Sequence, residues 1–241
     1  MKGEFVVVES PYGNRNSISS QNLWNEEYEK KNIASSFKGT LSHSVKFLLE
    51  YLNKKGANPK TFLDLGCGNG RNAIPLANMN YDVCGMDISN VALSQAKKLS
   101  EQICANQPSF YYGSMGEPLQ FNDSMFDVVM DITSFDILIK DKEIECHKKE
   151  IMRVSKKGGH FLYYDMADDD PYSLELLAKS PDRDKGVIYT PTGIPFKIYS
   201  EHSIEKIFKD FNVMAQEKFK FQDMMDGKIW DRSLLCMIFR K

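Results

Sequence analysis

This sequence lacks paired cysteines and long apolar runs. Its five cysteines are scattered and none forms a C-x-x-C pair, which is typical of reduced thiols rather than of a disulfide framework. No uncharged apolar stretch approaches the roughly 18 residues of a membrane span. Glu4 and Glu9 flank only a short apolar run, which argues against a signal peptide. We therefore expect a cytoplasmic protein that does not enter a membrane.

An excess of charge of one sign is also missing. The 31 Lys and Arg residues nearly balance the 33 Asp and Glu residues, for a net charge of −2. Because surfaces that bind nucleic acids usually carry a basic excess, this balance argues against a nucleic-acid partner. The four histidines stand without evident partner ligands, so no metal site is expected. A chain of 241 residues that is 42% hydrophobic suits a globular monomer or homodimer.

The sequence predicts one domain that follows a short N-terminal arm. Residues 1–22 are polar and rich in turn formers, which predicts a loose N-terminal arm, and residues 23–241 are expected to form a single domain. Two helical patterns occupy 23–55, and Ser42 is the expected N-cap of the second. Strands are then expected at about 61–65, 83–87, 109–112, 126–131 and 160–165, separated by helices that include 90–105 and 142–155. This alternation predicts a mostly parallel sheet with helices on both faces.

Finer details of these elements can also be predicted. Helix 90–105 is expected to begin after Ser89. Lys156–Gly159 is expected to mark the end of helix 142–155. The residues expected on the buried face of helix 90–105 are Ala92, Ala96, Leu99 and Ile103.

The last third of the chain follows a different pattern. Prolines interrupt residues 166–200, where only the run SLELLAK predicts a helix, and so long an irregular segment is usually a lid or a binding insert. A helix is expected at 203–210. Residues 212–222 and 229–239 then read as two strands joined around Asp226-Gly227, which predicts an antiparallel hairpin.

A glycine-rich loop in FLDLGCGNGR, residues 62–71, follows the first strand of the alternation. A phosphate-binding P-loop is excluded because no Lys-Ser/Thr follows Gly70. A dinucleotide fingerprint requires a third glycine at position 71, where this chain has Arg. This departure argues against an NAD-linked oxidoreductase.

Acidic residues near the loop indicate a different ligand. Asp64, on the strand before the glycines, would repel a pyrophosphate but attract an ammonium or a sulfonium. Asp87 ends the next strand, where a carboxylate accepts hydrogen bonds from the two hydroxyls of a ribose. Gly113-Ser114-Met115 follows the third strand and is placed to flank an adenine ring. A ligand with adenine, ribose and a cationic amino-acid end is S-adenosylmethionine.

Several motifs carry a resemblance to a known family. FLDLGCGNGRNAIPLA, the strand end at Asp87, FDVVMD and EIMRVSKKGGHFLYY resemble the successive motifs of class I S-adenosylmethionine-dependent methyltransferases. GCGNGRNAIPLA, NYDVCGMD and PTGIPFKIYSEHSIEKIF are most similar to the tellurite-resistance-type branch and its small-molecule relatives. The resemblance implies an α/β, Rossmann-like, doubly wound sheet of seven mostly parallel strands with an antiparallel C-terminal hairpin. It also implies S-adenosylmethionine as cofactor, S-adenosylhomocysteine as product and a small-molecule acceptor.

Carried over by position, the resemblance assigns roles on the donor side. Asp64 and the carbonyl of Gly66 would take the methionine amino group, and Asp131 would lie beneath the sulfonium. Ser114 stands where the family often has an acid, so its contact with the adenine is expected to be weaker or to run through water. The expected cofactor-binding residues are Asp64, Gly66, Cys67, Gly68, Gly70, Asp87, Ile88, Ser114, Met115 and Asp131.

The acceptor side is less constrained by the sequence. Asp131 and Asp165 are the catalytic candidates, with Asp165 as a possible general base or merely a cap of the next turn. Candidate substrate contacts are Trp24, Tyr28, Phe135 and Tyr164, and core packing is the alternative for these aromatic residues. His147, within the Lys-rich run ECHKKE, is expected at the surface. Helices within 23–55 and the insert 166–200 are the candidates for an acceptor-side lid.

Missing motifs narrow the acceptor. The fourth strand is followed by DITSF rather than by Asp/Asn-Pro-Pro-aromatic, which argues against methylation of adenine bases or glutamine. No Pro-Cys follows it either, which argues against cytosine C5 chemistry. Two alternatives to a small-molecule methyltransferase stay open: a methyltransferase that acts on RNA or protein, and a non-catalytic regulatory protein that binds S-adenosylmethionine.

Overall fold

Seven strands form one sheet in the order β3-β2-β1-β4-β5-β9-β8. The computed structural model describes residues 15–31, 39–190 and 193–241. β1 through β5 run parallel to one another, whereas β9 is antiparallel to both β5 and β8. The strands are β1 Thr61–Leu65, β2 Asp82–Asp87, β3 Ser109–Tyr112, β4 Phe126–Ile132, β5 Ser155–Met166, β8 Asn212–Met225 and β9 Lys228–Arg240. The predicted Rossmann-like sheet with its antiparallel hairpin is confirmed.

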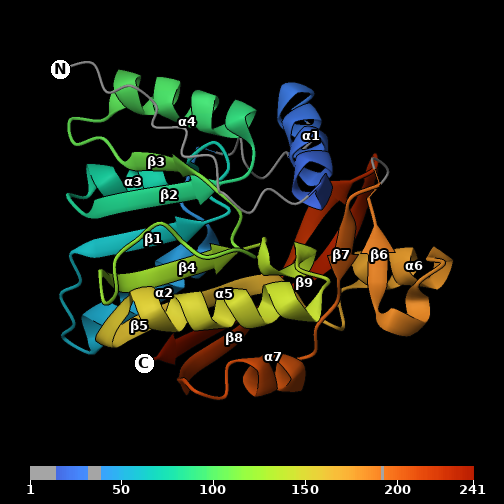
Figure 1. Cartoon of the computed structure of the whole chain (residues 1–241). Helices are drawn as coiled ribbons and strands as arrows, with labels where there is room; N and C mark the ends of the chain where they lie inside the picture. The colour runs from blue at the N-terminus through green and yellow to red at the C-terminus, as the bar shows by residue number, and fades with distance from the viewer. Residues whose placement is uncertain (1–14, 32–38, 191–192) are drawn as a thin grey trace.

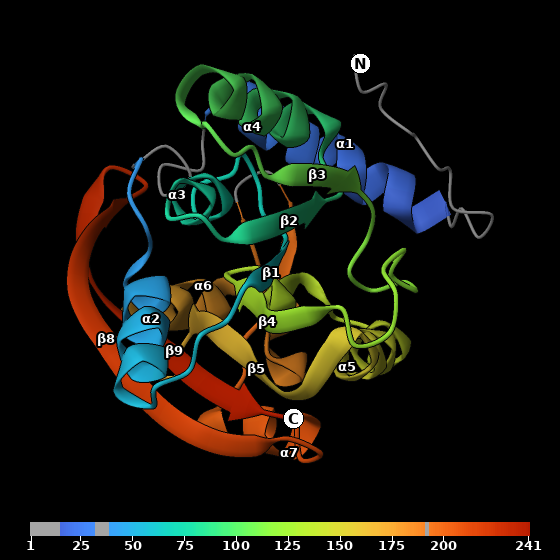
Figure 2. The same cartoon turned by 90° about the vertical axis from the view of Figure 1, so that its left-hand side faces the viewer.

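Helices cover both faces of the sheet. Figure 2 shows α2 and α3 on one side of the strands and α5 and α7 on the other. The helices are α1 Arg15–Glu29, α2 His43–Lys54, α3 Ala73–Asn78, α4 Asn90–Ile103, α5 Asp141–Val154, α6 Pro171–Lys179 and α7 Glu201–Ile207. One apolar core joins α2 and α3 to the sheet and a second joins α5 and α7 to it. Because both faces are buried, the central strands are almost wholly apolar.

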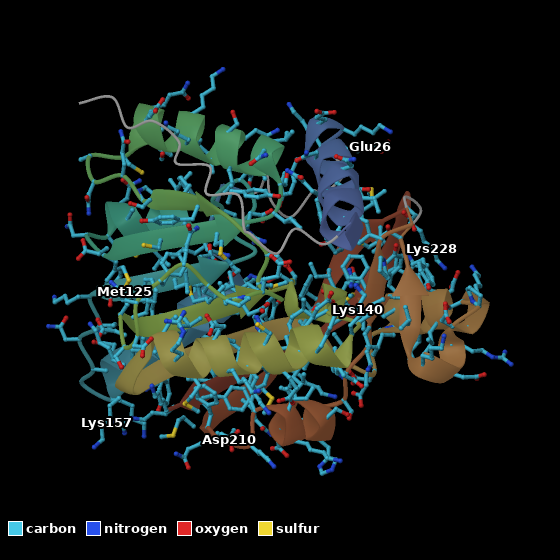
Figure 3. The ribbon with its side chains drawn as sticks, viewed as in Figure 1. Glu26, Met125, Lys140, Lys157, Asp210 and Lys228 are labelled. Carbon is cyan, nitrogen blue, oxygen red and sulfur yellow. The ribbon has the colours of Figure 1, made fainter. Side chains whose placement is uncertain are left out.

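The order of the strands reverses between β1 and β4, which are neighbours although β2 and β3 lie between them in sequence. In an open sheet of this kind, ligands bind outside the carboxyl ends of the strands at such a point. The arrowheads of β1, β2 and β4 point toward α1 (Figure 1). Met125 and Lys157 lie at the opposite end of the sheet from Lys140 (Figure 3).

Two helix starts agree with the predicted caps. Ser42 accepts a hydrogen bond from the Val45 amide at the start of α2, and Ser89 accepts one from Ala92 at the start of α4. The predicted buried face of α4 needs correction, because Leu99 is 41% exposed. Ile103 is exposed too, and the stripe that packs inward contains Ala92, Leu93, Ala96 and Ser100.

The predicted end of α5 at Lys156–Gly159 is also corrected. β5 begins already at Ser155 and includes this segment, whose pairing with β4 shifts in register between Phe126 and Val128. Gly158 has a φ of +77°, which an L-residue rarely adopts. These glycines therefore allow an irregular start to the strand instead of ending the helix.

The insert is more regular than the prolines suggested. After α6, the short strands β6 Val187–Tyr189 and β7 Pro195–Lys197 pair in antiparallel fashion. This small unit lies beyond the carboxyl edge of the main sheet (Figure 1). The predicted loose arm is corrected in part, because residues 15–22 belong to α1; residues 1–14 lie outside the described residues.

The C-terminal hairpin is confirmed. Asp226 and Gly227 have φ values of +52° and +74°, the left-handed pair that a two-residue hairpin turn requires. Within the part of the chain that the structure describes, no helix has both the length and the apolar character needed to cross a membrane.

Asp170 attaches the insert to this hairpin. It is fully buried and accepts hydrogen bonds from the Ser173 amide in α6 and from Arg232 Nε in β9, at 3.0 and 2.9 Å. The Ser233 amide donates to it as well. Loss of this carboxylate would leave the buried Arg232 guanidinium without its partner, which is strongly destabilising.

We predict that Asp170→Ala lowers the free energy of unfolding by about 3–5 kcal/mol. Asp168→Ala is the matched control, because Asp168 lies two residues away on the surface, where it forms an ion pair with Lys218 at 3.4 Å; its loss should cost about 0–1 kcal/mol. Denaturant unfolding of both variants measures the difference. Equal losses in the two proteins would contradict the role assigned to Asp170.

Candidate functional site

A cleft opens at the carboxyl ends of β1, β2 and β4, where the order of the strands reverses. Its walls come from the loops after these strands and after β3, and α1 closes one side. The residues that line it are Trp24, Tyr28, Gly66, Cys67, Arg71, Asn72, Met86, Asp87, Ile88, Gly113, Ser114, Met115, Ile132, Thr133, Ser134, Ile137 and Leu138. Eight of these lining residues are site residues predicted from the sequence: Trp24, Tyr28, Gly66, Cys67, Asp87, Ile88, Ser114 and Met115.

The glycine loop needs its glycines for two reasons. Gly66 and Gly68 have φ values of +66° and +55°, in the left-handed region where L side chains are strained. There is also no space for a side chain, because a Cβ on Gly66 would lie 2.5 Å from Ser134 Cβ. A Cβ on Gly68 would lie 2.1 Å from Tyr28 Oη. The loop therefore brings bare backbone to the cleft and places Ser134 and Tyr28 directly against it.

Asp87 ends β2 and braces the glycine loop. Its Oδ2 accepts a hydrogen bond from the Gly68 amide and its Oδ1 accepts one from Ser89, both at 2.8 Å. The side chain is buried yet lines the cleft, and burial raises its pKa to about 6. A carboxylate oxygen has capacity beyond one hydrogen bond. Asp87 therefore has acceptor sites left for the hydroxyls of a ribose.

Asp64 lies on β1 next to the glycine loop, but it is not among the residues that line the cleft. It is 2% exposed, and its Oδ2 has no hydrogen-bond partner among the described residues. Burial, and then the nearby Asp131 and Asp87 carboxylates, raise its pKa to about 8. A cation in this region would stabilise the ionised form. The residues present thus fit a ligand that carries an ammonium and a sulfonium, as S-adenosylmethionine does.

The opposite wall of the cleft suits the flat apolar face of an adenine. Met86, Ile88 and Met115 line it, and the Ser114 hydroxyl accepts a hydrogen bond from the Gly116 amide at 3.3 Å. Cys67 also lines the cleft, and burial holds the pKa of its thiol well above its ordinary value. The thiol therefore stays protonated and serves as part of an apolar wall.

Asp131 lies beneath the cleft rather than in it. It is fully buried, and its Oδ1 accepts a hydrogen bond from Ser134 Oγ at 2.7 Å. Its Oδ2 lies 3.0 Å from Nε2 of His147. The predicted surface position of His147 is wrong, because this side chain is 1% exposed and belongs to the buried stripe of α5. The spacing of Ile144, His147, Ile151 and Val154 was the signal that could have revealed this.

Asp165 does not reach the cleft, so its predicted role as a base in contact with the acceptor is corrected. Its carboxylate is buried and accepts hydrogen bonds from the Met166 and Asp136 amides at 2.8 and 3.1 Å. Burial, and then the Asp131 carboxylate, raise its pKa to about 7. The pKa of the adjacent Asp136 is also raised, chiefly by burial. Asp165 therefore holds the Phe135–Ile137 turn that follows β4, rather than the turn after its own strand.

The aromatic candidates divide into two groups. Trp24 and Tyr28 of α1 line the cleft, and the Trp24 ring contacts Phe196 of β7 edge to face, with centroids 6.2 Å apart. Phe135 is fully buried in the core beside α5, and Tyr164 packs against Phe219 in the other core. Neither of these two lines the cleft, because a turn aims Phe135 inward and Tyr164 faces the layer of α2.

The lining residues that sequence reasoning missed follow β4. Ile132 ends this strand and lines the cleft together with Thr133 and Ser134, which follow it directly; Ile137 and Leu138 come next. Thr133 has a φ of +54°, a strained conformation that holds the backbone against the cleft. Arg71 also lines the cleft, and its Nε donates to the Thr40 carbonyl at 3.1 Å.

We predict that Asp87→Ala weakens binding of S-adenosylhomocysteine by about 2–4 kcal/mol, because charge-assisted hydrogen bonds to the ribose hydroxyls are lost. Asp82→Ala, at the exposed start of the same strand, is the control and should bind like the parent protein. Titration calorimetry measures both. An unchanged dissociation constant in Asp87→Ala would refute the ribose assignment.

The raised pKa of Asp64 predicts proton release on binding. At about pH 7 a carboxyl group with a pKa near 8 is mostly protonated, and a bound ammonium lowers its pKa and expels the proton. Affinity for S-adenosylhomocysteine should therefore rise with pH up to about 8. Calorimetry in two buffers of different ionisation enthalpy counts the protons. Release that is equally large in Asp64→Asn, or with adenosine as ligand, would contradict this assignment.

Comparisons with known proteins agree with this geometry. A family model described as a methyltransferase domain matches residues 57–224. The Haemophilus influenzae protein named "Probable S-adenosyl-L-methionine-dependent methyltransferase TehB" is 23% identical over 65% of this chain and 48% of its own length. The mouse (Mus musculus) eEF1A lysine and N-terminal methyltransferase is 27% identical over 62% of this chain and 22% of its own length. The chain thus spans less than two thirds of the length of these curated relatives.

A solved structure extends the likeness to almost the whole chain. The 1,6-didemethyltoxoflavin-N1-methyltransferase of Burkholderia thailandensis, with bound 1,6-didemethyltoxoflavin and S-adenosylhomocysteine, covers 97% of this chain and 93% of its own. Its TM-score is 0.68 at 13% identity, which shows a shared fold. The prediction of a class I methyltransferase fold with S-adenosylmethionine as cofactor is confirmed. Since the family model matches well over half of the sequence, this chain belongs to the methyltransferase domain family.

Proposed function

We propose that this protein transfers the methyl group of S-adenosylmethionine to a small-molecule acceptor by in-line displacement. The observation that carries the proposal is the contact between Trp24 of α1, which lines the cleft, and Phe196 of β7. We infer that α1 and the insert together form an acceptor-side lid, a roof over the cleft. A cleft covered from two sides suits an acceptor that enters whole more than one segment of a large molecule.

On the donor side, the protein's own residues bind and orient. Asp87 holds the ribose, Asp64 lies near the cationic amino-acid end, and the Met115 side of the cleft flanks the adenine. When bound, S-adenosylmethionine supplies a methyl group that its own sulfonium activates. The protein's remaining task is to align an acceptor lone pair with that methyl group and to exclude water, an effect worth up to about 7–11 kcal/mol of the barrier.

The cleft has few groups able to remove a proton from the acceptor. Among its lining residues, the titratable side chains are Tyr28, Cys67, Arg71 and Asp87. Cys67 stays a thiol, and Asp87 is engaged with the glycine loop. We therefore propose an acceptor that arrives with an available lone pair, such as a thiolate, a soft chalcogen anion or an aromatic nitrogen, and needs no protein base.

Known proteins of this fold support the proposal only by analogy. The Burkholderia neighbour is named for a small molecule, 1,6-didemethyltoxoflavin, whereas the mouse relative is named for a protein, eEF1A. The family match begins at residue 57, so α1 with Trp24 and Tyr28 lies outside it. Of the two elements that meet at Trp24 and Phe196, α1 thus lies outside the family match, whereas β7 lies within it.

We expect labelled S-adenosylmethionine to transfer its methyl group to the low-molecular-weight fraction of a cell extract. The extract is separated by ultrafiltration, each fraction is incubated with the full-length protein, and the labelled product is identified by mass spectrometry. The Asp87→Ala protein serves as the blank. Label that appears only in retained protein or RNA would replace the small-molecule proposal with the macromolecular one. No label in either fraction, despite donor binding, would favour a non-catalytic binding protein.

A further inference from the structure

The buried His147 has no role in the chemistry proposed above, yet it lies between two walls of the cleft. It occupies an inward position of α5, beside β4. Its Nδ1 lies 3.1 Å from the Met115 carbonyl, and its Nε2 lies 3.0 Å from Asp131 Oδ2. Both imidazole nitrogens therefore face a polar atom, although the side chain is shielded from solvent.

The neighbouring groups determine where the imidazole carries its protons. A carbonyl oxygen only accepts hydrogen bonds, so Nδ1 must be protonated to bond to Met115. On the other side, Nε2 lies 3.0 Å from Asp131 Oδ2, but neither of these two atoms has a hydrogen-bond partner among the described residues. His147 and Asp131 thus form a close buried pair, and the bond from Nδ1 to Met115 is the one contact of the imidazole with hydrogen-bond geometry among the described residues.

Asp131 continues the chain of contacts toward the glycine loop. Its other oxygen accepts a hydrogen bond from Ser134 Oγ, which also lies 3.0 Å from the Leu65 carbonyl. Ser134 packs directly against Gly66. The contacts therefore run from Met115, beside the adenine, through the two buried side chains to the start of the loop that holds the amino-acid end.

Two hydrogen bonds hold the peptide group between Met115 and Gly116, in the loop that is expected to flank the adenine. The Met115 carbonyl bonds to His147, and the amide of Gly116 in the same peptide bonds to the Ser114 hydroxyl. Ser114 and Met115 line the cleft, whereas His147 does not. The Phe135 ring packs against the imidazole with centroids 5.4 Å apart, which limits its rotation. This contact gives Phe135 a role in the core.

We infer that His147 is a positioning residue that holds the Ser114–Met115 loop in place for the adenosyl group of the donor. The inference rests on the placement of S-adenosylmethionine in the cleft but not on the identity of the acceptor. Without the bond from Nδ1, the Met115 peptide is free to rotate and the wall that flanks the adenine loses its fixed position. Loss of this hydrogen bond should therefore weaken the binding of adenosine and of ligands that contain it.

Two substitutions separate the two contacts of the imidazole. In His147→Asn, the side-chain amide nitrogen takes the place of Nδ1 and keeps the bond to Met115 while losing Asp131. In His147→Gln, the longer side chain reaches toward Asp131 and loses Met115. Both leave one buried partner unpaired, so both should lower stability, and their melting temperatures are measured first.

The readout is the affinity for S-adenosylhomocysteine and for adenosine alone, measured by calorimetry. We expect His147→Gln to weaken both ligands by about tenfold or more, as loss of one well-placed hydrogen bond implies, and His147→Asn to restore most of that loss. Glu145→Gln, on the exposed side of α5, should change neither affinity. Equal affinities in the Asn and Gln variants would overturn the inference. Absence of binding by the parent protein would instead reject the donor site itself.

A measurement on the unmodified sequence covers the case in which the variants fail to fold. In protein labelled with ¹⁵N-histidine, the His147 ring should show a proton on Nδ1 that exchanges slowly with water. Its signals should shift when S-adenosylhomocysteine or adenosine is added. An unprotonated Nδ1, or signals that neither ligand moves, would contradict the proposed role of His147.

Discussion

The burial of carboxylates at the carboxyl edge of the sheet is the constraint on which this site depends. Asp64 and Asp87 stand at the ends of neighbouring parallel strands, and burial raises the pKa of both. Backbone amides satisfy Asp87, but Asp64 keeps an oxygen with no partner among the described residues. Such an arrangement opposes folding when ionised and favours a cationic ligand. The burial of carboxylates that destabilises the ligand-free protein therefore favours a cationic ligand over an anionic one at this site.

Side chains from other elements, rather than contacts between the loops, hold the loops around these buried carboxylates. Asp87 holds the Gly68 amide, Ser134 lies against Gly66, and His147 holds the Met115 carbonyl. Each bracing residue comes from a different strand end or helix, so the donor cleft takes its shape from the sheet and α5 together. A site built on such elements is held more firmly than one built on loops alone. This suits a cofactor whose methyl group must be aligned closely with its target.

The acceptor end is built differently. Its roof joins α1, which precedes the family match, to the insert that carries β7, and the described contact between their rings is a single edge-to-face pair, Trp24 and Phe196. One such pair contributes only about 0.5–1.5 kcal/mol beyond its buried area, so it joins the two elements only weakly. A firmly braced donor site and a weakly joined roof together explain how one fold can serve different acceptors.

The sequence by itself determined the donor loop, the mostly parallel sheet implied by alternating elements, and the C-terminal hairpin. These features follow from local chemistry: glycines where φ is positive, acids at strand ends and an Asp-Gly turn. Packing decided the rest. Asp165 and Phe135 look like cleft residues in the sequence because they follow strands, but they point into the interior.

His147 shows the reverse error, since its charged neighbours in sequence hid its position on the buried stripe of α5. Whether a polar residue faces water, a partner or a ligand depends on which face of its helix or strand meets another element. That is a property of tertiary contact, not of residue type.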